Sequence, residues 1–173
     1  MSTIDPLITA EEIAQATAQL GARISRDYDG KDLLLLSVLK GSVVFLADIM
    51  RQITIPYAID FMAVSSYGNS RTSSGAVKIN LDLKQDIGGR HVLIIEDIVD
   101  SGLTLSYLMG LLKGRAPASL EVCALLNKRS RNEIQLEPKY QGFDLPDAFV
   151  VGYGLDYAEQ YRGLPYIGDL RGV

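Results

Sequence analysis

The sequence predicts an α/β fold whose central, mostly parallel sheet is flanked by helices. Two observations support this prediction. Largely apolar runs of strand length, at residues 33–39, 91–95 and 120–126, are typical of strands that are buried on both faces of a sheet. Segments with apolar residues at helical spacing, such as 43–53 and 103–112, separate these runs. Strands that alternate with helices imply parallel crossover units, and a chain of 173 residues is expected to hold one such domain.

The amino-terminal half is expected to begin with a helix. Thr9 and Glu12 have the spacing of a capping box, in which each side chain accepts a hydrogen bond from the other residue's backbone N–H. Apolar residues follow at helical spacing until Asp29-Gly30 marks a turn. The other elements expected here are a strand at 33–39, an interruption at Lys40-Gly41-Ser42, a helix at 43–53 and a strand at 57–66.

The rest of the chain is expected to complete the sheet. Residues 67–75 contain almost no apolar side chains and are interpreted as an exposed, mobile loop. Residues 77–83 alternate apolar and polar side chains, as an edge or hairpin strand does. The remaining expected elements are a turn at 88–89, a strand at 91–95, a helix at 103–112 that Gly114 ends, and strands at 120–126 and 149–154.

The composition restricts the classes of partner. Seventeen Lys and Arg residues against 21 Asp and Glu residues give a net charge of −4 and a pI of about 5.0, which disfavours a nucleic-acid-binding role. The single cysteine, Cys123, is expected to be a small core residue and fits a reducing compartment. The chain shows neither a bilayer-spanning apolar run nor a basic region of the kind that opens a secretory signal. We therefore expect a cytoplasmic protein with small-molecule substrates and no nucleic-acid or membrane partner.

The segment 92–104 carries the candidate chemistry. An apolar strand delivers Glu96 and Asp97 to the edge of the sheet, and residues 100–104 (DSGLT) then lead into a helix. Such a turn aims backbone N–H groups and two hydroxyls at a monophosphate, at the positive end of the helix dipole. Carboxylates beside a phosphate site accept hydrogen bonds from sugar hydroxyls or hold Mg²⁺, whose charge offsets theirs. Glu96 and Asp97 are therefore candidate ribose and metal contacts.

The run VLIIEDIVDSGLT resembles the phosphoribosyl diphosphate (PRPP) motif of type I phosphoribosyltransferases. Other segments resemble the bacterial hypoxanthine-guanine members of that family, in the family's order and across nearly the whole chain. These segments are Lys40-Gly41, Ser66-Tyr67, residues 126–129 (LNKR) and residues 149–162 (FVVGYGLDYAEQYR). The chain has neither a P-loop nor a GxGxxG motif that would favour another nucleotide-binding class.

The resemblance implies a fold and a reaction. The expected fold is the type I phosphoribosyltransferase fold, with a core at about 30–140, a small hood from about 1–15 and 141–173, and a mobile lid at about 66–76 that contains Ser66 and Tyr67. The expected reaction is Mg²⁺-dependent and belongs to purine salvage. In this reaction a 6-oxopurine, either hypoxanthine or guanine, and PRPP give the nucleoside 5′-monophosphate and diphosphate.

The resemblance also implies a role for each matching residue. Asp100 is the expected general base or acid at purine N7, and Lys128 is the expected donor to O6, which selects 6-oxopurines over adenine. The expected contacts are Asp100, Ser101, Gly102, Leu103 and Thr104 to the 5′-phosphate; Glu96 and Asp97 to the ribose; Lys128, Phe149, Val150 and Asp156 to the base; Lys40, Gly41 and Arg162 to the diphosphate; and Glu96, Asp97 and Asp156 to Mg²⁺. In this family the Lys40–Gly41 peptide bond can be cis, and some members carry Lys in place of Leu103.

Several of these residues, taken alone, have simpler interpretations. Lys128 is also typical of a solvated basic turn, Phe149 of a core, and Asp156 with Arg162 of a surface ion pair. The alternative functions are a regulatory homologue that binds RNA and a phosphoribosyltransferase for another base such as xanthine. The family usually forms dimers or tetramers, and the apolar helices at 43–53 and 103–112 are candidate interfaces.

Overall fold

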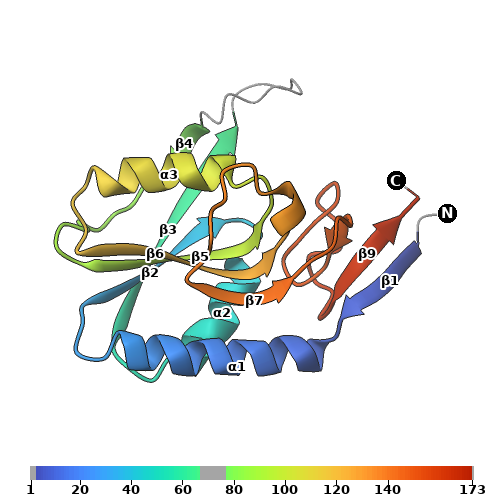
Figure 1. The fold of residues 1–173 in the computed structure, drawn as a ribbon, viewed down its shortest axis with the longest axis horizontal. Helices are drawn as coiled ribbons and strands as arrows, with labels where there is room; N and C mark the ends of the chain where they lie inside the picture. Colours follow the sequence, from blue (N-terminus) through green and yellow to red (C-terminus); the bar gives the residue numbers. More distant parts are fainter. Residues whose placement is uncertain (1–2, 67–76, 173) are drawn as a thin grey trace.

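The computed structural model describes residues 3–66 and 77–172, which form two sheets (Figure 1). The larger sheet has six strands in the order β4-β3-β2-β5-β6-β7. Neighbouring strands are parallel except β3 and β4, which are antiparallel, so the predicted, mostly parallel sheet is confirmed. The strands are β2 (Leu33–Leu39), β3 (Tyr57–Ser66), β4 (Val77–Leu81), β5 (His91–Val99), β6 (Ser119–Asn127) and β7 (Tyr140–Asp144).

Helices cover both faces of this sheet. Helices α1 (Ala10–Asp27) and α2 (Val43–Gln52) lie on one face, and α3 (Leu103–Lys113) lies on the other (Figure 1). In β2, Leu33 and Leu35 belong to the core beneath α1 and α2, whereas Leu34 and Leu36 belong to the core beneath α3. Burial on both faces explains why the central strands are continuous apolar runs.

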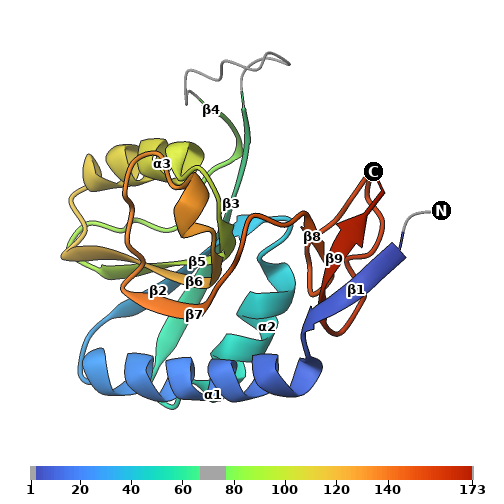
Figure 2. The ribbon, with the colours of Figure 1, turned by 45° about the vertical axis from the view of Figure 1, so that its right-hand side comes forward.

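The chain termini meet in a second, three-stranded sheet with the order β1-β9-β8. It consists of β1 (Thr3–Ile8), β8 (Val150–Val151) and β9 (Ile167–Arg171), all paired antiparallel, and it stands beside the core in Figures 1 and 2. Helix α1 packs along α2 and β7 on the large sheet. Of the amino-terminal segment, therefore, β1 joins the small sheet, while the helix that follows it belongs to the core.

Local signals placed most boundaries correctly. The capping box is confirmed, since Thr9 Oγ1 accepts from the Glu12 N–H at 3.2 Å and Glu12 Oε2 accepts from the Thr9 N–H at 2.8 Å. Cys123 is fully buried, as expected. The strand expected at 149–154 is shorter, because Gly152 and Gly154 have φ values of 96° and 97° and turn the chain. The loop at 67–75, including Tyr67, lies outside the described residues.

Strands β1, β7 and β9 were not predicted. β1 contains Pro6 and β7 contains Gly142, two residues that are depleted in strands. β1 and β9 are also short, and each finds its partner at the opposite end of the chain. A pairing of this kind leaves no local pattern, so only the tertiary structure reveals it.

The contact between α1 and α2 gives a stability prediction. A Cβ atom at Gly21 of α1 would lie 2.8 Å from the Gln52 carbonyl oxygen and would overlap the Gln52 Cβ. We expect Gly21→Ala to force the helices apart and to lower the free energy of unfolding by about 1–3 kcal/mol, despite the better helix propensity of alanine. Urea denaturation monitored by circular dichroism measures the change.

The matched control is Gly110→Ala in α3, where an added Cβ would meet no atom within 4 Å. Helix propensity acts alone at this position, so the free energy of unfolding should rise by about 0.5–1 kcal/mol. If Gly21→Ala is stabilising like the control, close packing does not require glycine at residue 21.

Candidate active site

Several of the predicted site residues lie at or just after the carboxyl ends of three parallel strands. Gly41 follows β2, Glu96 and Asp97 lie in the last part of β5, and Lys128 follows β6. Parallel strands present these ends at one edge of the sheet, where α/β proteins bind ligands. A cavity of about 300 Å³ opens there. The cavity is lined by seven of the predicted site residues, namely Gly41, Glu96, Asp97, Asp100, Ser101, Gly102 and Thr104. The other residues that line it were not predicted and are Val38, Leu39, Ile98, Val99 and Leu105.

The turn from Asp100 to Thr104 has a backbone conformation that suits an anion. Gly102 is the N-cap of α3 and has a φ of 79°, the left-handed conformation that favours glycine. Its missing side chain also makes room for Ile134, because a Cβ would lie 3.0 Å from Ile134 Cγ1. The Ser101 hydroxyl accepts from the Leu103 N–H at 3.3 Å, and Thr104 is exposed in the first turn of α3. N–H groups of a first helical turn lack intrahelical acceptors and suit an anion.

Two adjacent carboxylates, Glu96 and Asp97, also line the cavity. Burial raises the pKa of Glu96 well above its ordinary value, and the neighbouring Asp97 charge adds to this effect. Burial also raises the pKa of Asp97, although the Ile98 N–H, which donates to Asp97 Oδ1 at 2.7 Å, and the Arg162 charge oppose the increase. A pair of acids in such surroundings favours a cation or hydroxyl donors beside it.

The backbone of Gly41 lies directly against Asp97. A Cβ atom at residue 41 would overlap the Asp97 Oδ2, and a Cβ at Gly154 would overlap the Gly41 carbonyl oxygen. The peptide bond before Lys40, Leu39–Lys40, is cis. This bond is one residue earlier in the chain than the Lys40–Gly41 bond, which can be cis in the family that the sequence resembles. The loop after β2 is thus held between β5 and the segment that contains Gly154.

Lys128 is buried, with its side chain only 6% exposed, so the interpretation as a solvated basic turn is wrong. Its ammonium lies 3.9 Å from Asp100 Oδ2. The backbone N–H of Lys128 donates to the Val99 carbonyl at 2.9 Å. This hydrogen bond fixes the start of the loop after β6 beside the end of β5. A buried ammonium is stable when a carboxylate compensates its charge.

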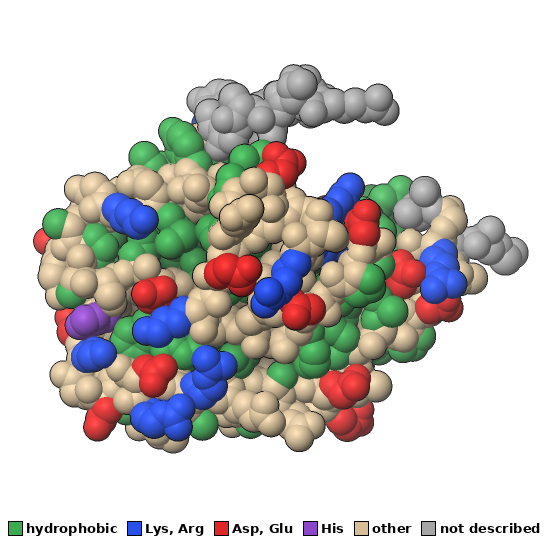
Figure 3. Space-filling view, in the orientation of Figure 1, with side chains coloured by type: hydrophobic (Ala, Val, Ile, Leu, Met, Phe, Trp, Pro, Cys, Tyr) green, Lys and Arg blue, Asp and Glu red, His purple; other side chains and the backbone are tan. Residues whose placement is uncertain are grey.

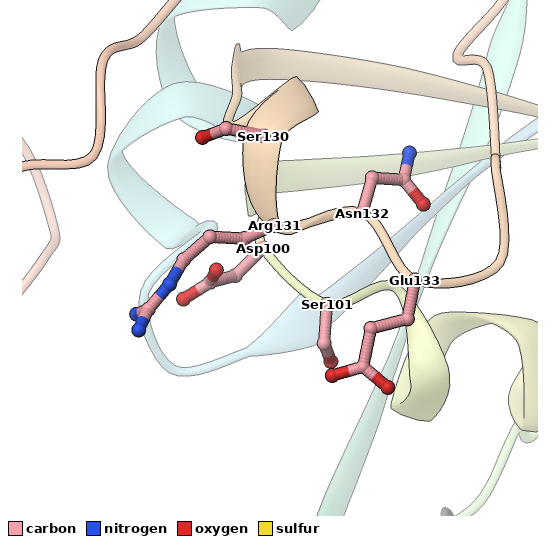
Figure 4. Close-up of a pocket in the computed structure, with 6 residues that line it drawn as sticks. All are labelled: Asp100, Ser101, Ser130, Arg131, Asn132 and Glu133. Atoms are coloured by element: carbon pink, nitrogen blue, oxygen red, sulfur yellow. The ribbon is translucent and has the colours of Figure 1, made fainter.

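A second cavity of about 490 Å³ shares Asp100 and Ser101 with the first. The loop after β6 supplies its other walls, namely Ser130, Arg131, Asn132 and Glu133 (Figure 4). The Asp100 carboxylate and the Arg131 guanidinium point to the same side in this view. Sequence reasoning did not select these four loop residues. The basic run at 128–131 was their only local signal.

Val150 lies in the small sheet and Phe149 directly precedes it, and neither residue lines these cavities. Phe149 is 47% exposed, so its interpretation as a core residue is wrong, and its ring packs edge-on against Tyr157 with centroids 5.6 Å apart. Val150 is buried and pairs with Asp169 of β9. The small sheet thus fixes the backbone of both residues, since the Leu170 N–H also donates to the Phe149 carbonyl at 2.8 Å, while the Phe149 ring stays exposed.

Lys40, Arg162 and two acids form one ion-pair network. Arg162 Nη2 lies 3.0 Å from Asp156 Oδ1 and 3.2 Å from Glu159 Oε1, and Lys40 Nζ lies 3.2 Å from Glu159 Oε2. Arg162 Nη1 also donates to the Gly154 carbonyl at 2.8 Å. The two cations expected for diphosphate are therefore brought together, through Glu159, which the sequence interpretation did not select.

The three acids expected for Mg²⁺ are not gathered in one place. Among residues 3–66 and 77–172, no group of three or more acidic, histidine or cysteine side chains is placed to hold a metal. Asp156 pairs with Arg162 instead and accepts from the Glu159 N–H at 2.9 Å. Glu96 and Asp97 are adjacent and remain as a pair of possible oxygen ligands.

Comparison with known proteins identifies the family. The profile of the phosphoribosyl transferase domain matches residues 5–158. The chain belongs to the phosphoribosyltransferase family. It is 55% identical to the hypoxanthine-guanine phosphoribosyltransferase of Mycobacterium tuberculosis over 170 residues, which cover 95% of this chain and 84% of that protein. Its identity to the Bacillus subtilis enzyme of the same name is 51% over 165 residues, which cover 95% and 92% of the two chains.

Solved structures place the chain in the type I phosphoribosyltransferase fold. A hypoxanthine phosphoribosyltransferase from Staphylococcus aureus superposes with a TM-score of 0.94 at 47% identity and covers 96% of this chain and 91% of that one. A hypoxanthine-guanine phosphoribosyltransferase from Bacillus anthracis gives a TM-score of 0.93 at 40% identity, with 99% and 100% coverage. The expected family and fold are both confirmed.

Two further observations concern the helices and the surface of the protein. Within the described ranges, none of the helices is both long and apolar enough to cross a bilayer. On the face shown in Figure 3, acidic and basic side chains are interspersed rather than gathered into a basic stripe.

The close contact at Gly41 gives a prediction for phosphoribosyl transfer. We expect Gly41→Ala to displace Asp97 or the loop after β2 and to lower kcat/KM for PRPP about 100-fold, the usual cost of misplacing a site by about 1 Å. Steady-state kinetics measure the loss, and thermal unfolding checks that the variant is folded. Gly163→Ala is the control, because an added Cβ there would meet no atom within 4 Å. Equal rates for the two variants would contradict the role of this contact.

Proposed function

We propose that this chain transfers the 5-phosphoribosyl group of PRPP to the 6-oxopurines hypoxanthine and guanine, in a Mg²⁺-dependent reaction that releases diphosphate. The observation that carries the proposal is the buried Lys128 ammonium 3.9 Å from the carboxylate of Asp100, a residue that lines the cavity. In a 6-oxopurine, the O6 acceptor and the N7 position are neighbours on one edge of the ring. An adjacent cation and carboxylate match that edge.

This pair also explains selectivity for the base. Lys128 donates to O6, and Asp100 holds or accepts the proton at N7. Adenine presents an amino group in place of O6, and this donor would face the ammonium of Lys128 without an acceptor between them. The exposed ring of Phe149 stacks on the purine, and the backbone of Val150 contacts its edge.

The remaining residues bind PRPP. The turn from Asp100 to Thr104 holds the 5′-phosphate, and Glu96 and Asp97 accept hydrogen bonds from the ribose hydroxyls. Purine N9 attacks ribose C1 while the bond from C1 to the diphosphate oxygen breaks, and the electron pair leaves with diphosphate. Lys40, the Gly41 backbone and Arg162 stabilise the charge that develops on this leaving group. A lid that includes Ser66 and Tyr67 would exclude water from the cationic ribose.

The carboxylates fit a Mg²⁺ ion. Glu96 and Asp97 are adjacent oxygen donors at the cavity wall, and in the described part of the chain neither forms an ion pair with a basic side chain. Mg²⁺ is usually held by one or two carboxylates, with substrate oxygens and water as its other ligands, so no larger acidic cluster is required. When bound, it neutralises charge on the departing diphosphate. Asp156 is a candidate ligand of a second ion on the diphosphate side.

We also propose a homo-oligomer, either a dimer or a tetramer. Tyr107 and Leu111 are one helical turn apart on α3 and are 41% and 37% exposed, and Val43 at the start of α2 is 43% exposed. Exposed apolar side chains on these two helices are suited to contacts between subunits. Light scattering coupled to gel filtration gives the mass, and a single-chain mass of 18.9 kDa would contradict this part of the proposal.

A turnover panel tests the proposed function. The protein, PRPP and Mg²⁺ are mixed in turn with hypoxanthine, guanine, xanthine and adenine, and nucleotide formation is followed by its ultraviolet spectrum. We expect turnover with hypoxanthine and guanine and none with adenine. The absence of turnover with both 6-oxopurines would refute the proposal, while turnover with xanthine alone would keep the reaction and change the base.

Asp100 has a specific expected effect. Asp100→Asn removes the proton acceptor at N7 and should lower kcat about 10²–10⁴-fold. Asp82→Asn is a matched control, because Asp82 has the same 46% side-chain exposure but pairs with Arg115 and lines none of the described cavities. Its kcat should stay within about twofold of the original value. An unchanged kcat for Asp100→Asn would remove Asp100 from its assigned role.

A further inference from the structure

The carboxylate of Glu159 is shared between two cations from distant parts of the chain. Its Oε2 lies 3.2 Å from Lys40 Nζ, after β2, and its Oε1 lies 3.2 Å from Arg162 Nη2. Each oxygen thus takes one cation, as two oxygens of a diphosphate would. Hydrogen bonds from Lys40 and Arg162, together with the charges of these two side chains, lower the pKa of Glu159.

The backbone at Glu159 indicates that the side chain has a use. Tyr157 and Gln160 pair across a two-residue turn, and Ala158 and Glu159 between them have φ values of 51° and 62°. Positive φ at both central residues is the pattern of a type I′ turn, which strongly prefers Asn and Gly. Glutamate is a poor choice for this conformation, and its side chain is 68% exposed, so core packing does not explain it. We therefore attribute the presence of Glu159 at this turn to its contacts with Lys40 and Arg162.

We propose that Glu159 is an affinity-determining residue for the diphosphate group, because its carboxylate and the diphosphate compete for Lys40 and Arg162. This inference rests on the proposed function, which assigns those two cations to diphosphate. An exposed, solvent-screened ion pair is weak, so a multiply charged diphosphate can displace the carboxylate. The competition weakens the binding of PRPP and of the product diphosphate and thereby favours product release.

Asp156 holds the competing carboxylate in place. Its Oδ2 accepts from the Glu159 N–H at 2.9 Å, and its Oδ1 lies 3.0 Å from Arg162 Nη2. The same short segment therefore carries a diphosphate cation, Arg162, and the acid that opposes it. When Glu159 moves away, Arg162 keeps its contacts with Asp156 and with the Gly154 carbonyl, so the cation stays positioned.

The test compares diphosphate binding by Glu159→Gln and by the original protein. Glutamine keeps the size of the side chain and removes its charge. With Mg²⁺ fixed, calorimetry should show that the Kd for diphosphate falls about 3- to 10-fold, and the KM for PRPP should fall in parallel while the KM for hypoxanthine stays constant. The difference should shrink as salt is added, because exposed charges are screened. Glu159→Asp keeps the charge on a shorter side chain and should lie between the two.

Glu137→Gln is the matched control. Glu137 is 62% exposed and pairs with Arg129 at 3.7 Å, so this variant makes the same change in net charge at another exposed ion pair. Its Kd for diphosphate should stay within twofold of the original value. Equal thermal midpoints for the original protein and the variants establish that binding is compared between folded proteins.

The outcomes separate the inference from the proposed function. Failure of the original protein both to bind diphosphate and to turn over a 6-oxopurine would refute the proposed function. If the original protein does both, an unchanged or higher Kd for Glu159→Gln overturns the competition. A higher Kd accompanied by a greater requirement for Mg²⁺ would assign Glu159 to support of the metal instead.

Discussion

The close approach of the Gly41 backbone to the Asp97 carboxylate is the constraint on which the rest of the site depends. It brings the loop after β2 against the end of β5, and Gly154 then packs against the other side of the same loop. Three segments that are far apart in sequence are thereby held at one edge of the sheet. Residues 41 and 154 have no room for a side chain at these contacts, so the three segments are closely packed against one another.

The basic side chains of the site form ion pairs in which a charged or polar group of the substrate can replace one partner. Lys128 is paired with Asp100, and Arg162 is paired with Asp156 and Glu159. Glu96 and Asp97 are a different case. Burial raises the pKa of both carboxyl groups, and we expect the bound ligand to bring the cation that compensates their charge. A site that must bind an anionic sugar phosphate, a divalent cation and a neutral base therefore contains both carboxylates and cations, and their positions rather than their sum determine what binds.

The segment from β5 into α3 could be selected from the sequence as candidate chemistry because its signals are local. The apolar run into Glu96 and Asp97 and the small-residue turn that follows lie within one continuous segment, and the structure lines one cavity with them. The buried state of Lys128 was not predictable from a basic run that is equally typical of solvent. The position of the cis bond, Leu39–Lys40 rather than Lys40–Gly41, and the role of Glu159 also had no pattern to indicate them.

The sequence by itself determined the alternation of strands and helices, the capping box at Thr9 and the anion turn at 100–104, because each depends on residues that are close along the chain. Only the tertiary structure decided the pairing of β1 with β9, the exposure of Phe149 and the meeting of Lys40 with Arg162 across Glu159. The pairing of β1 with β9 and the contact of Lys40 with Glu159 join residues that are more than a hundred positions apart. The exposure of Phe149 depends on which other segments pack against it. A contact of that kind is set by how the elements assemble, and no local periodicity records it.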